Sequence, residues 1–260
     1  MTEAGVVQGS RLGPHCFNIF INDIWQMPDT ELCLFVYDTA IMSSGPNADT
    51  TMSRLNTHLT ELGRWLIKWK IKINSEKFQT VYFSRSRNQP FPPKLCRWVT
   101  PWCEDTKYLG ITLDKKFTFK THITSIKTKL QQAREQLKPL IGKKSKLSLD
   151  NRMFLYKSML LPLISYACPV WLAAANKCIL SLESPHNVAI RRIIRMPWFI
   201  RNENIRKYLD LPTIKEYYKK NAKKFYHKLY SSTNTAILSI PTYDLRSNRN
   251  RRRPRAALHR

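Results

Sequence analysis

The feature that most constrains the fold is a stretch of helical periodicity that runs from His122 almost to residue 230. Apolar residues recur there at the spacing of a buried helix face. Residues that break or end helices divide the stretch, namely Pro139, Gly142, Pro162, Pro185, Pro197 and Pro212. Since proline lacks the backbone N–H that a helix interior uses, we expect a series of separate helices.

The first 120 residues show a different pattern, in which helical and strand-like segments alternate. We expect a helix that begins at Pro14, and a second helix that runs to about residue 70 with Asp49 or Thr50 as its N-cap. We also expect a hairpin in which Gly110 and Asp114 mark the turns. The apolar face of the second helix is marked by Leu55, Leu59, Leu62, Leu66 and Trp69. Strands are expected over 31–42 and on both sides of a polar turn at 74–77, and a proline-rich loop over 86–101.

This order of elements predicts an α+β fold, in which an antiparallel sheet precedes an all-α part. We expect an α+β domain over residues 1–113 and helical regions over 114–175 and 176–245. The last segment, 246–260, reads "RSNRNRRRPRAALHR". It is a low-complexity basic tail, whose composition cannot form a core.

The chain carries far more basic than acidic residues. Its formal net charge is +26 and its isoelectric point is about 10.1. Such an excess favours a polyanionic partner, because each phosphate that a lysine or arginine neutralises releases condensed counterions. Nucleic acid is the first candidate and an anionic membrane surface is the second.

The cysteines and the apolar segments bear on the compartment. The six cysteines are scattered without a C-x2-C pair, so neither a zinc site nor a disulfide framework is indicated. "MTEAGVVQGS" does not have the pattern of a signal peptide. The apolar segment 159–175 is short for a membrane span and contains Pro162 and Pro169, which favours a buried, kinked helix. We expect a nuclear or cytoplasmic protein that is not secreted.

One acid interrupts an apolar run. "LCLFVYDTAIM" (32–42) reads as a buried strand with Asp38 near its end. Such a residue is most often found in a turn or at a cap, and the functional alternative is a metal ligand.

Segments in order along the chain resemble motifs of the reverse transcriptases of non-LTR retrotransposons, with the jockey-like clade the most similar. "GVVQGSRLGPHCFNIFINDI" resembles motif B, "LFVYDTAIM" motif C, "WLIKWKIKINSEKFQTVYFS" motif D and "KYLGITLD" motif E, the primer grip. "FTFKTHI" stands where the family begins its thumb, and "RMPWFIRNENI" resembles a segment beyond it. The resemblance covers roughly residues 5 to 215. It implies a partial polymerase palm over 1–113, a helical thumb over 114–175, and an RNA template and DNA primer as partners.

The family joins nucleotides by in-line phosphoryl transfer with two Mg²⁺ ions, which hard carboxylate oxygens hold. The resemblance implies one aspartate from motif A and an adjacent pair in motif C. Alignment on Phe35 places Tyr37 at the first position of that pair and Asp38 at the second. Tyrosine is neutral near pH 7 and cannot replace an anionic ligand. Motif A and the fingers lie upstream of motif B in the family, so we expect them to be missing, and we predict that this chain alone cannot polymerise DNA.

Departures from the family pattern are scattered over several motifs, as Val7 and Phe78 illustrate. A decayed or truncated element copy is the favoured interpretation. An error at codon 37 and a host-recruited protein are the alternatives.

Other positions correspond to softer parts of the family pattern. Gln8 and Gly9 match motif B, which lies near nucleotide and template, or they form a simple turn before a helix. Lys77 matches a proposed proton donor in motif D, or it is a solvated turn residue. Leu109 and Gly110 match the primer grip, or they form an ordinary hairpin turn.

Basic residues in the second half are candidates for phosphate contacts. In the expected thumb they include Lys115, Lys116, Lys120, Lys127, Lys129, Lys143 and Lys144. The tail adds Arg251, Arg252 and Arg253. Contacts of this kind give affinity without reading sequence. "KEYYKKNAKKFYHK" (215–228) fits either rings that stack on bases or an amphipathic helix with a buried aromatic stripe.

Three functions compete at this point. The first is a reverse transcriptase segment with Mg²⁺ as the family's cofactor, and the second is a non-catalytic nucleic-acid-binding protein that uses the thumb and tail. The third is a membrane-surface protein built on the basic helices.

Overall fold

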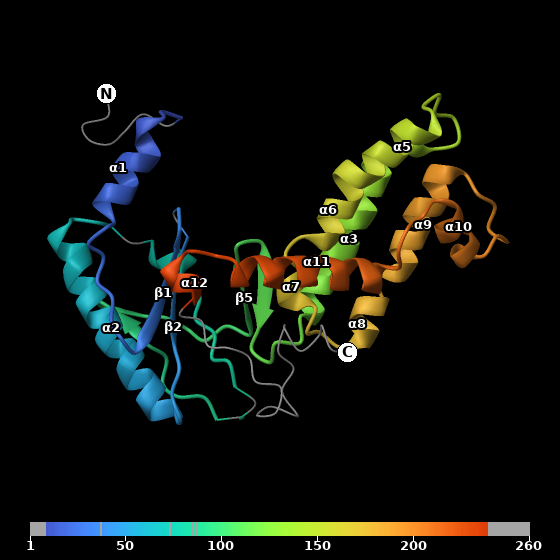
Figure 1. The fold of residues 1–260 in the computed structure, drawn as a ribbon. Helices are drawn as coiled ribbons and strands as arrows, with labels where there is room; N and C mark the ends of the chain where they lie inside the picture. Colours follow the sequence, from blue (N-terminus) through green and yellow to red (C-terminus); the bar gives the residue numbers. More distant parts are fainter. Residues whose placement is uncertain (1–8, 37, 73, 85, 87, 239–260) are drawn as a thin grey trace. The chain divides into compact units, whose positions relative to one another are not determined.

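The structure is a computed structural model that describes residues 9–36, 38–72, 74–84, 86 and 88–238 of the chain (Figure 1). The chain divides into two compact units, Met1–Lys116 (unit 1) and Phe117–Arg260 (unit 2). Helices combine with small antiparallel sheets, so the α+β class is confirmed.

Unit 1 begins with a short helix and a hairpin. Helix α1 spans Leu12–Phe20, and strands β1 (Thr30–Phe35) and β2 (Asp38–Ser43) pair antiparallel. The predicted single strand over 31–42 is therefore wrong. The chain reverses after Phe35, where Val36 has a φ of 53°, and two residues suffice to connect antiparallel strands.

Helix α2 (Ala48–Lys68) supplies most of the core of unit 1. Its N-cap is Asn47, whose side chain accepts a hydrogen bond from the Thr50 N–H at 2.8 Å. The predicted caps Asp49 and Thr50 are wrong, because Asn47 is the residue with extended backbone and an amide oxygen within reach of the first free N–H groups. The buried cluster consists of Leu59, Leu62, Trp65 and Leu95.

The region after α2 is mostly irregular. Ser75–Lys77 form a 3₁₀ turn (η1). Two strands were predicted around this turn, but the residues described there form an isolated bridge between Thr80 and Trp102 and no strand. The Asn74 side chain accepts the Glu76 N–H at 3.1 Å and so favours the helical turn. The predicted loop contains a small hairpin, β3 (Lys94–Leu95) with β4 (Trp98–Val99).

The last hairpin of unit 1 is confirmed. Strands β5 (Asp105–Tyr108) and β6 (Ile111–Asp114) pair through a two-residue connection. Leu109 and Gly110 have φ angles of 46° and 79°, as a tight turn of the primed type needs.

Unit 2 is helical, as the periodicity predicts. Its elements are α3 (Lys120–Gln136), α4 (Lys138–Ile141), α5 (Leu149–Leu155), the π-helical segment η2 (Tyr156–Leu160), α6 (Leu161–Ser165), α7 (Cys168–Trp171), α8 (Asn176–Leu180), α9 (Glu183–Ile194), α10 (Asn202–Tyr208), α11 (Ile214–Tyr230) and α12 (Thr235–Leu238). Pro185 does not divide the helices as predicted. It lies in the first turn of α9, where a missing N–H costs no hydrogen bond.

The apolar segment 159–175 lies in the core of unit 2. It breaks between α6 and α7, where Ala167 has a φ of 49°. Leu160, Ile164, Cys168 and Trp171 are buried, as expected for this segment. No helix in the described part of the chain is long and apolar enough to cross a membrane.

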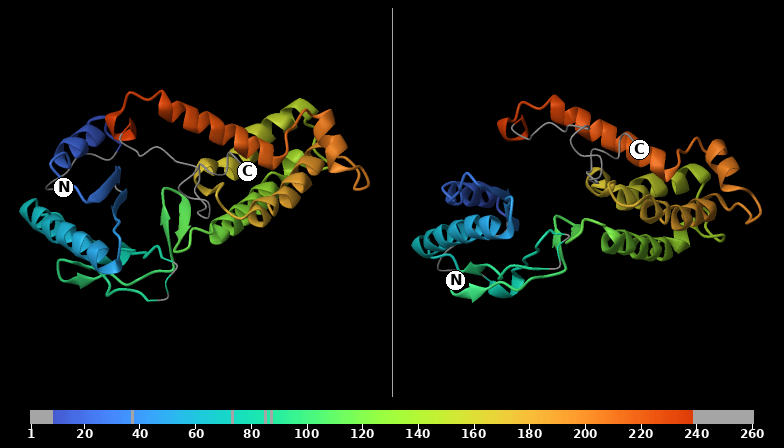
Figure 2. Two further views of the ribbon diagram at one scale, coloured as in Figure 1. Left: turned by 60° about the horizontal axis from the view of Figure 1, so that its bottom comes forward. Right: turned by 90° about the horizontal axis from the view of Figure 1, so that it is seen from below.

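Buried aromatic residues tie α11 to this segment. Figure 2 shows α11 in two further views, and it packs against α7. The Tyr218 hydroxyl donates to the Ile164 carbonyl at 2.9 Å, and the Tyr218 ring meets that of Trp171 edge-on at 4.9 Å. The Tyr156 hydroxyl and His186 Nε2 form a second buried hydrogen bond at 2.6 Å.

Candidate nucleic-acid interface

The hairpin β1–β2 presents the motif C residues. Asp38 opens β2 opposite Phe35, and both side chains are exposed. Tyr37 lies outside the described residues. The Tyr108 hydroxyl of β5 donates to the Cys33 carbonyl of β1 at 3.4 Å, so the motif C and motif E hairpins meet within unit 1. Burial raises the pKa of Tyr108, and Cys33 and Asp38 raise it further.

The donor set around Asp38 does not fit a magnesium ion. Mg²⁺ is held by hard oxygen ligands in octahedral geometry, usually with more than one carboxylate at a two-metal site. Across the described ranges, no three His, Cys, Asp or Glu residues come together in a way that could hold a metal. Asp38 is the motif C carboxylate that the structure describes.

The motif B and motif D positions lie on turns. Gly9 has a φ of 87°, which only glycine adopts readily, and it is exposed. Gln8 lies outside the described residues. Lys77 ends η1, its side chain is exposed, and its N–H donates to the Asn74 carbonyl.

The predicted phosphate-binding lysines differ in their surroundings. Lys115 lies 2.6 Å from Glu104 in an ion pair. The remaining thumb lysines are exposed or, for Lys127, half-buried; the exposed ones are Lys116, Lys120, Lys129, Lys143 and Lys144. Arg251, Arg252 and Arg253 lie outside the described residues.

Helix α11 carries a basic face that the sequence left ambiguous. Ile214, Tyr218 and Ala222 form a buried stripe, so the interpretation as an amphipathic helix is right for these positions. The opposite side, here called the α11 lysine face, consists of Lys219, Lys220, Lys223, Lys224 and His227. Glu216 also lies there, but its carboxylate accepts the Thr213 N–H in a capping box.

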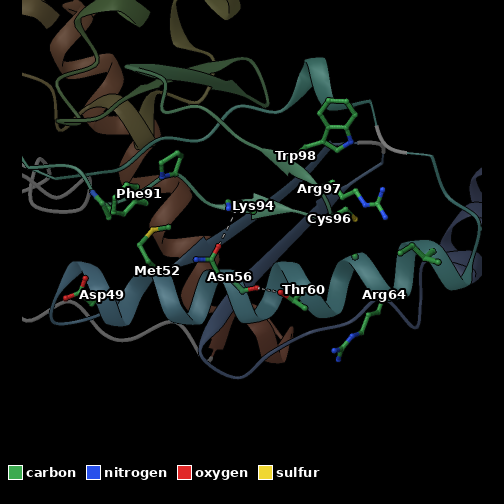
Figure 3. Close-up of a pocket in the computed structure, with 14 residues that line it drawn as sticks. Asp49, Met52, Asn56, Thr60, Arg64, Phe91, Lys94, Cys96, Arg97 and Trp98 are labelled. Carbon is green, nitrogen blue, oxygen red and sulfur yellow. Dashed lines mark hydrogen bonds between the residues drawn. The ribbon is translucent and has the colours of Figure 1, made fainter.

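A groove on unit 1 was not found from the sequence. It lies between α2 and residues 90–98, with a volume of about 1080 Å³ (Figure 3). Its walls come from segments that are far apart in the chain, and only the basic and aromatic character of 91–98 hints at it.

The comparisons with known proteins agree with the motif order. Residues 1–113 match the family described as reverse transcriptase (RNA-dependent DNA polymerase). The chain is 30% identical over 97% of its length to a probable RNA-directed DNA polymerase from transposon X-element of Drosophila melanogaster. It is 29% identical over 92% of its length to the RNA-directed DNA polymerase from mobile element jockey of the same fly, and 29% over 99% to that of Drosophila funebris.

The chain spans less than a third of these relatives, covering 28%, 27% and 29% of their lengths. No solved structure matches it. These matches confirm the resemblance that the motifs predict: the chain is similar to the reverse transcriptases of jockey-like non-LTR retrotransposons, and residues 1–113 carry the match to the reverse transcriptase family.

Proposed function

We propose that this chain is the segment of an RNA-directed DNA polymerase that contacts the RNA template and DNA primer. Residues 1–113 are a partial palm and 114–175 a helical thumb. Residues 176–245 are a further helical region, and 246–260 are a basic tail. The observation that carries the proposal is the β1–β2 hairpin, which presents Asp38 within the residues that match the reverse transcriptase family.

Phosphate contacts supply the affinity in this proposal. The thumb lysines Lys120, Lys129, Lys143 and Lys144 are exposed. The α11 lysine face adds a row in which like charges recur at i and i+4, an arrangement that weakens an isolated helix. A bound phosphate backbone removes this repulsion and releases counterions.

Catalysis by this chain alone is not part of the proposal. The family reaction needs Mg²⁺, whose chemistry is to stabilise charge on the reacting oxygens. Asp38 occupies the second position of the motif C pair and Tyr37 the first. The described residues do not supply the remaining carboxylates. We assign Gly9, Gln8 and Phe35 to template and nucleotide contacts, Leu109 and Gly110 to the primer, and Lys77 to proton transfer only in a complete polymerase.

Primer extension and nucleic-acid binding, measured on the same protein, test the expected lack of polymerase activity and the expected affinity for the hybrid. With a primed RNA template, Mg²⁺ and deoxynucleotides, we expect no extension but salt-sensitive binding of the hybrid. Mg²⁺-dependent nucleotide incorporation would overturn the inactivity. An affinity that does not change with salt would overturn the proposal that phosphate contacts supply it.

A non-catalytic nucleic-acid-binding protein is the second candidate. The α11 lysine face favours it, because exposed lysines can bind phosphates without any of the motif B to E residues. If this candidate is right, replacement of the lysines of that face weakens binding, whereas Asp38→Asn and changes at Gly110 leave it unchanged. A loss of hybrid binding on changes at Gly110, in a folded chain, favours the polymerase segment.

A further inference from the structure

The groove between α2 and residues 90–98 has walls that are held in place. The Lys94 N–H donates to the Asn56 side chain at 3.4 Å, and the Thr100 N–H and hydroxyl both bond to the Pro93 carbonyl, at 3.0 and 2.9 Å. At Gly63 a Cβ atom would lie 3.0 Å from Cys96 Sγ, so helix and hairpin approach closely there. These contacts therefore hold the two walls of the groove in fixed positions.

Two aromatic rings stand exposed on this groove. Phe91 is 92% exposed and Trp98 is 62% exposed. Single exposed apolar residues are common on proteins, but two rings along one hollow are a less usual arrangement. Figure 3 shows them toward opposite ends of the groove, with Lys94 between them.

The charges on the lining are mainly positive. Lys94 and Arg97 have exposed side chains, and Arg64 lies on the helix side, where it also pairs with Glu61 at 2.5 Å. Asp49 is the acid on the described lining, at the first turn of α2. The positive charges favour a ligand with anionic groups, and the two exposed rings favour one with flat apolar faces.

We propose that this groove binds a single-stranded polynucleotide. Its bases stack on Phe91 and Trp98, and its phosphates lie near Lys94 and Arg97. The choice of nucleic acid rests on the proposed function. The site is an additional one, because its lining includes none of the motif residues Asp38, Gly110 or Lys77.

A single strand fits these groups better than a duplex or the chain's own tail. In a duplex the base faces are covered by neighbouring bases, whereas a single strand offers each base to an aromatic ring without regard to sequence. The basic tail 246–260 is repelled by Lys94 and Arg97, since like charges disfavour that occupant.

The test replaces both rings in the full chain, as Phe91→Ala with Trp98→Ala. Because stacking on a ring accounts for roughly a tenfold change in affinity per base, we expect binding of a 20-nucleotide oligothymidylate to weaken at least about tenfold. Binding of a 20-base-pair duplex stays within about twofold. Fluorescence anisotropy of labelled oligonucleotides measures both.

Matched controls separate stacking from folding and from charge. Trp198→Ala with Phe199→Ala removes another exposed aromatic pair, 87% and 68% exposed, and should leave single-strand binding unchanged. Phe91→Leu with Trp98→Leu keeps apolar bulk without the rings and should lose the same affinity as the alanine pair. Lys94→Gln with Arg97→Gln should lower the salt slope for single strands by about 1.4, or roughly 0.7 per charge.

Three outcomes would overturn the inference. Unchanged oligothymidylate binding by the alanine pair would show that the rings do not stack on bases. An equal loss for single strand and duplex would show that the groove does not select single strands. Failure of the unaltered chain to bind any nucleic acid would remove the proposed function as well, which distinguishes that failure from the other two.

Discussion

The two units bury their apolar side chains to very different extents. In unit 2, residues from many helices are almost fully enclosed, such as Trp171 and Ile164 at 0% exposure. In unit 1 the described part of α1 has no buried residue, and large apolar side chains such as Ile19 and Ile67 are 77% and 72% exposed. The core of unit 1 is small and centres on one face of α2.

Because of this difference, we expect unit 2 to be the more stable part of the chain. Free energy from apolar burial scales with the area removed from water, so unit 2 gains more of it than unit 1. Two buried hydrogen bonds, Tyr156 with His186 and Tyr218 with the Ile164 carbonyl, also lie in unit 2. We expect unit 2 to unfold as a stable cooperative body and unit 1 to open first.

The largest effect is expected for Trp171→Ala. Removal of this ring leaves a cavity beside the rings of Tyr218 and His122, and should lower the free energy of unfolding of unit 2 by roughly 3–5 kcal/mol. Urea denaturation of the full chain, followed by circular dichroism at helical wavelengths, measures it. Trp198→Ala is the control, and since that ring is 87% exposed its effect should stay within about 0.5 kcal/mol. Equal losses for both variants would contradict the burial contrast.

A smaller loss is expected for Leu62→Ala in unit 1. Its neighbours include partly buried side chains such as Leu55 and Leu66, which can move into the space. We expect a loss of about 2 kcal/mol, the low end of the range for such changes, against about 4 kcal/mol for Ile164→Ala in unit 2. Hydrogen exchange of the full chain reports the two units separately. A larger loss for Leu62→Ala than for Ile164→Ala would reverse the comparison.

Acid should destabilise unit 2 through His186. Burial, with a contribution from Arg206, lowers the pKa of His186 to about 4. The unfolded chain therefore binds a proton that the folded chain does not as the pH falls from about 6.5 toward 4, so stability is lost over that window. At pH 5 the loss from this group is roughly 2 kcal/mol relative to pH 7.

His186→Gln provides the control for the acid effect. It keeps a hydrogen-bonding side chain near Tyr156 but cannot titrate. Unfolding free energies of both proteins at pH 7 and pH 5 give the comparison. If the variant loses as much stability between these pH values as the parent does, His186 is not the cause.

The smallest of these effects is expected for Tyr218→Phe. The change removes the hydroxyl that donates to the Ile164 carbonyl and keeps the ring against Trp171, so about 1 kcal/mol should be lost. Tyr208→Phe, at a position 69% exposed, should change stability by less than about 0.5 kcal/mol. Thermal denaturation in parallel resolves the pair, and indistinguishable variants would mean that the buried hydrogen bond contributes nothing net.

Periodic patterns predicted the helices well, whereas reversals were predicted where a glycine marks them, as at Gly110, and missed elsewhere. The spacing of Leu59 and Leu62 identified the buried face of α2, because a helix repeats its environment every turn. The hairpin β1–β2 was missed because its connection contains Val36 instead of the glycine or asparagine that usually marks such a turn. The N-cap was missed because three neighbouring residues, Asn47, Asp49 and Thr50, all have cap-forming side chains.

In the candidate site too, sequence patterns predicted some features, and tertiary packing determines the others. The motif order predicted the family. The structure adds that Phe35 pairs with Asp38 across a hairpin, which presents the Asp38 carboxylate at the start of β2. The groove could not be predicted, because tertiary packing brings residues 90–98 to α2 and no local pattern encodes it. The α11 lysine face could not be assigned from the sequence, because the burial of Ile214, Tyr218 and Ala222 on the opposite side depends on tertiary packing.

The most direct test of the proposed phosphate contacts is the salt dependence of RNA–DNA hybrid binding by the full chain. We expect the logarithm of the association constant to fall linearly with the logarithm of the salt concentration. Replacing Lys219, Lys220, Lys223 and Lys224 with glutamine should lower the slope by roughly 0.7–0.9 per lysine, or about 3 in total. An affinity that is the same at low and high salt would show that phosphate contacts do not supply the affinity.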